Sequence, residues 1–146
     1  MPAIVIGGDT EAGDKILQRL NQPNREVRAF VTDEQAGARL KEAGIKVAIG
    51  DLSDEGHVEA ASLHCFSAIL IAEAACDDRE RSFIDDPLEV TRSWARAVTA
   101  AGVTRAIWVS QDEPELTGTP ESAWVEPRHN DLVEAVVRLD DAQSIE

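Results

Sequence analysis

The chain has 146 residues, the usual length of one domain and enough to bury a hydrophobic core. Its net charge of −14 would repel nucleic-acid phosphates, and no apolar run reaches the ~20 residues of a membrane helix. Because Met1 leads directly into a short apolar stretch with no basic leader, we expect one cytoplasmic domain, residues 1–146, with no membrane or nucleic-acid partner.

The first motif is the stretch PAIVIGGDTEAG, residues 2–13. A short apolar run, residues 3–6, stops at Gly7 and Gly8, and a helical pattern begins after Gly13. The order strand, glycine turn, helix is typical of the first unit of a dinucleotide-binding fold. The turn is expected to present backbone N–H groups and a helix N-terminus to a pyrophosphate.

Strand and helix patterns then alternate to the end of the chain. The predicted strands are residues 3–6, 26–31, 45–49, 67–72 and 104–110, and the predicted helices are near residues 15–21, 32–43, 53–61, 86–101 and 129–139. Residues 73–85 and 111–127 are predicted as loops, the second because it is polar and contains three prolines.

Three helix starts carry capping signals. Thr32, followed three residues later by Gln35, has the spacing of a capping box. Ser53 is expected to cap the next short helix, and Asp86, which precedes Pro87, is expected to cap the fourth.

The alternation predicts an α/β fold, a Rossmann-like, doubly wound parallel sheet of about five strands between two helix layers. Residues 128–146 would form a C-terminal helix and tail. Ligands of such sheets bind beyond the carboxyl ends of the strands, where the strand order reverses. The segments predicted at that edge are Gly7–Gly13, Thr32–Asp33, Gly50–Leu52, Ala72–Ala75 and Ser110–Asp112.

Four segments, in order, resemble the NmrA-like, NAD(P)H-binding group of atypical short-chain dehydrogenases. They are AIVIGGDTEAG, the βα units from Val27 to Ala61, the GDL of residues 50–52 within them, and WARAVTAAGVTRAIWVS, residues 94–110. The resemblance covers roughly residues 3–139. It implies an NAD(P)-binding Rossmann-like domain.

The resemblance also implies cofactor-binding positions. Gly7, Gly8, Asp9, Thr10 and Gly13 would form the phosphate-binding turn. The further positions are Thr32 and Asp33 after the second strand, Asp51 and Leu52 at the adenine, Ala72 near the nicotinamide ribose, and Ser110 at the end of the fifth strand.

The turn departs from the family pattern. Thr10 stands where the family has the middle glycine of GxxGxxG, and Asp9 and Glu11 bring carboxylates to a phosphate site. Thr32 replaces the arginine that often binds the 2′-phosphate of NADP. Asp33 would either accept from a ribose hydroxyl, which favours NAD, or start the next helix. The implied cofactor is therefore NAD or NADP, bound weakly, with NAD favoured.

The catalytic pair of the family is missing from this chain. Those dehydrogenases move a proton with a tyrosine and a lysine four residues later, together with a serine. The chain has no tyrosine and no lysine after Lys46, so no catalytic residue is predicted. Cys65 and Cys76 fit neither a redox pair nor a zinc site, and no metal site is predicted.

The end of the chain suggests a partner. Family members continue through a sixth strand and a substrate-binding region, whereas this chain is predicted to stop after the helix at residues 129–139. The wide apolar stripe of that helix predicts a homodimer or a hetero-partner. Trp124, in the proline-containing loop, is a second candidate for a partner contact.

Three functions remain open on the sequence. The first is a non-catalytic, weakly dinucleotide-binding module that acts as a sensor or subunit. The second is a small NAD(P)H-dependent oxidoreductase or isomerase completed by a partner subunit. The third is a degenerate scaffold that binds no nucleotide, which Thr10 and the acidic turn would explain.

Overall fold

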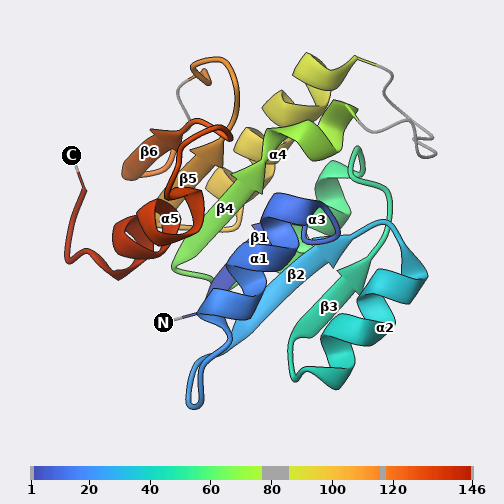
Figure 1. Ribbon diagram of the computed structural model, residues 1–146. Coiled ribbons are helices and arrows are strands. Elements are labelled where there is room, and N and C mark those ends of the chain that lie inside the picture. Colours follow the sequence, from blue (N-terminus) through green and yellow to red (C-terminus); the bar gives the residue numbers. More distant parts are fainter. Residues whose placement is uncertain (1, 77–85, 116–117, 146) are drawn as a thin grey trace.

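The computed structural model describes residues 2–76, 86–115 and 118–145, and these form a parallel sheet of six strands (Figure 1). The strand order is β3-β2-β1-β4-β5-β6. The strands are β1 (Ala3–Ile6), β2 (Val27–Val31), β3 (Lys46–Ile49), β4 (Ser67–Ile71), β5 (Arg105–Val109) and β6 (Glu121–Val125). The chain runs outward from β1 in one direction and then from β4 in the other, so the strand order reverses between β1 and β4.

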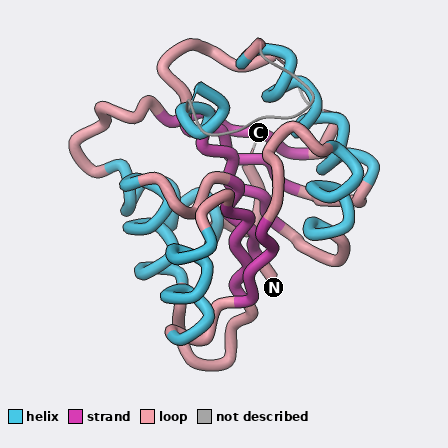
Figure 2. Tube along the Cα trace, turned by 90° about the vertical axis from the view of Figure 1, so that its right-hand side faces the viewer, coloured by secondary structure: helices cyan, strands magenta, loops and turns pink. Residues whose placement is uncertain are grey.

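Helices cover both faces of the sheet (Figure 2). The helices are α1 (Glu11–Leu20), α2 (Glu34–Glu42), α3 (Glu55–Ser62), α4 (Pro87–Ala100) and α5 (Leu132–Asp141), and a 3₁₀ turn, η1 (Ala72–Cys76), follows β4. One buried apolar cluster joins α1, α2 and α5 to the sheet, and a second joins α3 and α4 to its other face. The predicted α/β, three-layer, Rossmann-like fold is confirmed.

The sixth strand is the main correction to the predicted elements. Residues 111–127 were predicted as a loop, but β6 lies within them and pairs in parallel with β5, Trp108 opposite Trp124. The expectation that the chain ends before a sixth strand is also wrong. Pro120 and Pro127 lie just outside the strand, where a missing N–H breaks no ladder hydrogen bond.

Two of the predicted helix caps are one residue early. The cap of α2 is Asp33, whose carboxylate accepts from the amide of Gln35, and not Thr32. The cap of α3 is Asp54 and not Ser53. In both places an aspartate follows the predicted hydroxyl, and a carboxylate adds a favourable charge at the positive end of the helix. The predicted cap of α4, Asp86, is confirmed.

Helix α5 packs on the sheet of its own chain. Val136 and Val137 are buried in the first apolar cluster. The buried guanidinium of Arg105 donates through Nη1 to the carbonyl oxygens of Leu139, Asp140 and Ala142, at the end of the helix. Through Nη2 it donates to Glu121 at the start of β6, and its two nitrogens thereby join β5, β6 and α5.

Candidate functional site

The parallel sheet brings the predicted site segments to one edge. The glycine turn follows β1, Thr32 and Asp33 follow β2, Asp51 and Leu52 follow β3, Ala72 follows β4 and Ser110 follows β5. Since all six strands are parallel, these positions share the carboxyl edge, and the turn after β1 lies at the reversal of strand order.

The conformation and packing of the glycine turn require its first and last glycines, even without a ligand. Gly7 has φ +93°, a conformation that other residues rarely adopt. A Cβ at Gly13 would overlap the carbonyl oxygen of Gly7, so only glycine lets α1 approach the turn this closely. The amides of Gly7 and Gly8 both donate to the carbonyl of Phe30, which fixes the turn against β2.

Thr10 has a defined task at the position of the missing middle glycine. Its Oγ1 donates to the carbonyl of Gly7 at 2.7 Å and accepts from the amide of Gly13 at 3.0 Å. Thr10 is thus the N-cap of α1, with an ordinary extended backbone at φ −82°. The β-branched side chain is therefore compatible with the turn.

The N-terminus of α1 keeps the features that bind a phosphate. The amides of Glu11 and Ala12 make no hydrogen bond within the described residues, as expected for the first turn of a helix. Two nearby carboxylates are engaged in the same helix, because Glu11 pairs with Lys15 at 3.1 Å and Asp14 accepts from Gln18 at 2.8 Å. The backbone of the turn therefore fits a pyrophosphate, although Glu11 and Asp14 keep its surroundings acidic.

Asp9 fixes the end of β2 to the turn. Its Oδ2 accepts from the amides of Thr32 at 3.0 Å and Asp33 at 3.1 Å. Both amides are therefore occupied by a carboxylate of the chain itself. In dinucleotide-binding sheets the adenosine ribose lies near an acidic residue at this position, and NADP requires a cation there. In this chain the segment after β2 carries the carboxylate of Asp33, which accepts from the amide of Gln35, and lies against the carboxylate of Asp9.

The residues after β3 face inward. The Oδ1 of Asp51 accepts from the amide and the hydroxyl of Ser53, at 2.8 and 2.6 Å. Leu52 is buried, and its carbonyl accepts from the indole N–H of Trp94 at 2.7 Å. The predicted adenine-contact segment is therefore held by local and core contacts, with the Leu52 side chain in the apolar cluster under α3 and α4.

Two hollows lie along this edge. A small one of about 200 Å³ is lined by Gly8, Asp9 and Thr10 from the turn, together with residues of α1 and α2 that include Arg39. A larger cavity of about 650 Å³ is lined by Ala72 and Ser110, together with residues of α4 and of the loop after β5. Of the other predicted positions, Gly7, Gly13, Thr32, Asp33, Asp51 and Leu52 line neither hollow.

Ser110 is engaged in the wall of the larger cavity. Its hydroxyl donates to the carbonyl of Asp112 at 2.7 Å, and its carbonyl accepts from the indole N–H of Trp124 at 2.7 Å. Trp124 lies on β6, where its side chain is 39% exposed. A hydroxyl held in this way is a positioning group for the loop after β5.

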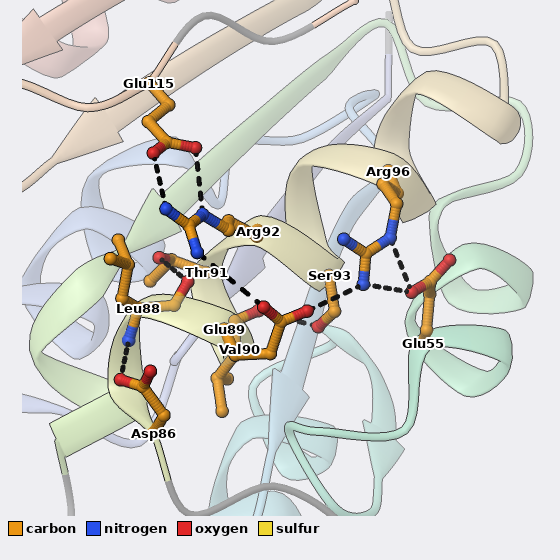
Figure 3. A network of polar contacts seen from close by, with 10 residues as sticks. All are labelled: Glu55, Asp86, Leu88, Glu89, Val90, Thr91, Arg92, Ser93, Arg96 and Glu115. Carbon is orange, nitrogen blue, oxygen red and sulfur yellow. Dashed lines mark hydrogen bonds and ion pairs between the residues drawn. The ribbon is translucent and has the colours of Figure 1, made fainter.

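An ion-pair network on α4 borders the larger cavity and was not predicted (Figure 3). Arg92 forms a two-pronged pair with Glu115, with nitrogen–oxygen distances of 2.8 and 3.0 Å. The hydrogen bonds from Arg92 lower the pKa of the Glu115 carboxyl. Arg96 pairs with Glu55 at 2.9 Å, and Glu89 contacts both arginines. The spacing of Glu89, Arg92 and Arg96 in the sequence already places them on one helix face, but the pairing with Glu115 depends on the fold.

Two negative findings apply to the described ranges. No three His, Cys, Asp or Glu side chains in residues 2–76, 86–115 and 118–145 gather where they could hold a metal ion. In the same ranges, no helix combines the length and the apolar character that a membrane crossing requires.

The family of the chain is shown by its similarity to known proteins. A family model described as NAD(P)H-binding matches residues 7–141, and no curated protein matches the chain. Because the match covers most of the chain, this protein belongs to the NAD(P)H-binding family, within the NmrA-like, atypical short-chain dehydrogenase group. The predicted family is confirmed.

Solved structures of reductases share the fold. A quinone oxidoreductase from Escherichia coli in complex with NADPH is 24% identical, with a TM-score of 0.60 over 75% of this chain and 36% of its own. An anaerobilin reductase from Escherichia coli O157:H7 is 22% identical, with a TM-score of 0.59 over 76% and 51%. A Citrobacter triphenylmethane reductase in complex with NADP(H) is 17% identical, with a TM-score of 0.62 over 75% and 37%. The matches therefore span about half or less of each of these chains.

Proposed function

We propose that this chain is a binding module for a nicotinamide dinucleotide and acts as a sensor or subunit rather than as a dehydrogenase in its own right. The observation that carries the proposal is the glycine turn at the reversal of strand order. Gly7 adopts the positive φ of the turn, and Gly13 lets α1 pack closely against it. The amides of Glu11 and Ala12 have no partner among the described residues. Family membership supports the same ligand.

The residues of the turn would hold the dinucleotide by its pyrophosphate. The amides of Glu11 and Ala12, at the positive end of α1, would donate to phosphate oxygens. Thr10 keeps the turn and the helix in register through its two hydrogen bonds. A nicotinamide ring supplies hydride transfer when it is bound. The solved structures that share this fold include reductases, which is consistent with such a ligand. The acidic side chains at the turn would keep affinity low.

The preferred dinucleotide is NAD. Asp9 accepts from the amides of Thr32 and Asp33, and no basic residue takes the place of Thr32. A ribose hydroxyl can donate to a carboxylate, whereas a 2′-phosphate would meet two negative charges at close range.

The non-catalytic assignment rests on the residues of this chain. It has no tyrosine, and its last lysine is Lys46, at the start of β3. The hydroxyl of Ser110 donates to the carbonyl of Asp112, and within the described residues no hydrogen bond joins it to a side chain that could act as a base. The tyrosine–lysine proton transfer of the family would need residues from another chain or segment.

A second candidate is a small oxidoreductase or isomerase completed by a partner. The observation that favours it is the cavity of about 650 Å³, which Ala72 and Ser110 line at the ends of β4 and β5. Such a volume suits a small organic substrate beside a nicotinamide ring. The partner could be a second copy of the chain docked on α5, where Leu132, Val133 and Leu139 are partly exposed. Equilibrium sedimentation at micromolar concentration tests this dimer, and a monomer there would contradict it.

Thermal unfolding with NAD⁺, NADH, NADP⁺ and NADPH tests the binding function. A ligand present at 100 times its dissociation constant adds about 2.7 kcal/mol of stability, which a thermal shift readily detects. We expect a shift with NAD⁺ or NADH and a smaller one with the phosphorylated forms. A shift without turnover of quinones or carbonyl compounds supports the sensor or subunit role. No shift with any of the four at millimolar concentration contradicts the proposal and leaves the degenerate scaffold.

A further inference from the structure

The side chains that line the larger cavity favour one kind of ligand, and this preference does not depend on a bound dinucleotide. Its apolar surface comes from Leu88 and Ala95 on α4, from Trp108 on β5 and from three prolines, and Leu88 is 49% exposed. Its volume of about 650 Å³ lies in the range of sites for small organic molecules. A flat or aromatic body fits such a surface.

The charged groups that line the cavity carry a net negative charge. Among the described residues they comprise four carboxylates and two guanidinium groups, which gives these six side chains a formal charge of −2. The carboxylates are Glu73, Asp112, Glu113 and Glu115, and the guanidinium groups are those of Arg92 and Arg96.

Both positive charges are already compensated (Figure 3). Arg92 holds Glu115 through two hydrogen bonds, and Arg96 holds Glu55 at 2.9 Å. An anionic ligand would have to break one of these pairs. By contrast, Glu73, Asp112 and Glu113 make no ion pair within the described residues. With respect to the described residues, these three carboxylates are available to pair with a positive charge in the ligand.

We propose that this cavity binds an organic cation with an aromatic or otherwise flat apolar body. The apolar surface of Leu88, Ala95 and Trp108 would hold the body, and Asp112 and Glu113 would face the charge. Two carboxylates within several ångströms of a cation, in a largely solvated cavity, account for a preference of about tenfold over a matched anion. This ligand is distinct from the nicotinamide dinucleotide, and its binding is measured without one.

Three compounds with one ring system test the charge preference. The probes are 9-aminoacridine, which is a cation near neutral pH, acridine, which is uncharged, and acridine-9-carboxylate, which is an anion. Fluorescence titration at physiological ionic strength should give affinities in that order, with about tenfold between cation and anion. Equal or tighter binding of the carboxylate overturns the proposal, and so does the absence of binding by the cation.

A pair of charge variants separates the cavity from the general acidity of the protein. The double variant Asp112→Asn/Glu113→Gln removes two carboxylates from the cavity. The control Glu34→Gln/Glu42→Gln removes two exposed carboxylates from α2, on the other face of the sheet. The cavity variant should bind 9-aminoacridine about threefold to tenfold more weakly, and the control should bind it nearly as tightly as the unaltered protein. Equal losses in the two variants overturn a local site.

Cys76 reports the location of the bound cation. It is exposed and lines the cavity, whereas Cys65 is buried and its burial raises the pKa of its thiol to about 11. A maleimide near neutral pH should therefore modify Cys76 and spare Cys65. Saturating 9-aminoacridine should slow this modification severalfold, and an unchanged rate would place the cation elsewhere and overturn the proposal.

Discussion

The two edges of the sheet use charged groups in different ways. At the amino-terminal edge, ion pairs close within the chain. Arg105 at the start of β5 donates to Glu121 and to the end of α5, and Glu26, before β2, accepts from Arg28 and Lys46. At the carboxyl edge, the amides of Glu11 and Ala12 have no such partners among the described residues, and neither do three carboxylates of the large cavity, those of Glu73, Asp112 and Glu113.

This difference separates stability from ligand binding. Polar groups that are buried and paired stabilise one arrangement of strands, whereas groups left without partners at a strand edge can bind a ligand. Substitutions at the amino-terminal edge should therefore change the free energy of unfolding, and charge substitutions at the carboxyl edge should mainly change ligand affinity. Three substitutions of charged residues test this separation, and one glycine substitution tests the packing of the turn.

Replacing Arg105 should have the largest effect. Its side chain is fully buried and donates to three carbonyl oxygens and one carboxylate. Arg105→Met would remove the donor from the three carbonyl oxygens and would leave Glu121 with only the amide of Ile145. We expect a loss of about 3–5 kcal/mol in the free energy of unfolding, measured by urea denaturation. The exposed Arg128 serves as control, and Arg128→Met should change stability by about 0.5 kcal/mol or less. A loss below about 1 kcal/mol for Arg105→Met would contradict a stabilising role for this edge.

Two glycines in helices give a matched test of the turn. A Cβ at Gly13 would overlap the carbonyl oxygen of Gly7, whereas a Cβ at Gly56 in α3 would meet only the Asp54 carboxylate, at 3.7 Å. Gly13→Ala should therefore lose about 2 kcal/mol of stability or more. Gly56→Ala should gain up to about 1 kcal/mol, because alanine favours a helix. Equal stabilities for the two variants would show that the turn can move away from α1.

Asp9 is the test of cofactor preference at the carboxyl edge. Asp9→Asn keeps an oxygen acceptor for the amides of Thr32 and Asp33 but removes the negative charge. The affinity for NADPH relative to NADH should rise about tenfold, or ~1.4 kcal/mol, in isothermal titration. The control Glu11→Gln removes an exposed charge from the same turn and should change both affinities alike. If the two variants shift the ratio equally, Asp9 has no specific role.

The smallest effect concerns acid pH at the amino-terminal edge. Hydrogen bonds from Lys46 and then Arg28 lower the pKa of Glu26 below its ordinary value of 4.5. The stability that Glu26 contributes is therefore present above pH 4.5 and is lost as the pH falls through its folded-state pKa. Near neutral pH, the free energy of unfolding of Glu26→Gln, measured by urea denaturation, should be about 0.5–1 kcal/mol below that of the unaltered protein. This difference should vanish in acid. A difference that stays constant with pH would mean that the carboxylate charge is not the cause.

The sequence predicts the fold well because its signals are local. Apolar runs, glycines after helices and the Gly7–Gly13 turn each depend on a few neighbouring residues. The strand β6 escaped prediction because it is short, lies between Pro120 and Pro127, and has only one buried residue, Val125. Its pairing with β5 depends on the fold and not on a local pattern.

The sequence predicts where the residues of the candidate site lie, but not which hydrogen bonds they make. The strand ends place Asp9, Thr32 and Asp33 at one edge, as expected. The sequence could not show that Asp9 occupies two amides after β2, since the partners are 23 and 24 residues away. The same holds for Arg92 and Glu115, which lie on different elements and meet only in the folded chain.

The central claim is that a nicotinamide dinucleotide binds at the N-terminus of α1. Backbone amide NMR spectra of the nitrogen-15-labelled protein, recorded during titration with NADH, test this directly. The account predicts that the amide signals of Glu11 and Ala12 shift the most and saturate together, with smaller shifts at Gly8 and Thr10. Saturable shifts confined to other parts of the chain, or none at millimolar NADH, would contradict it.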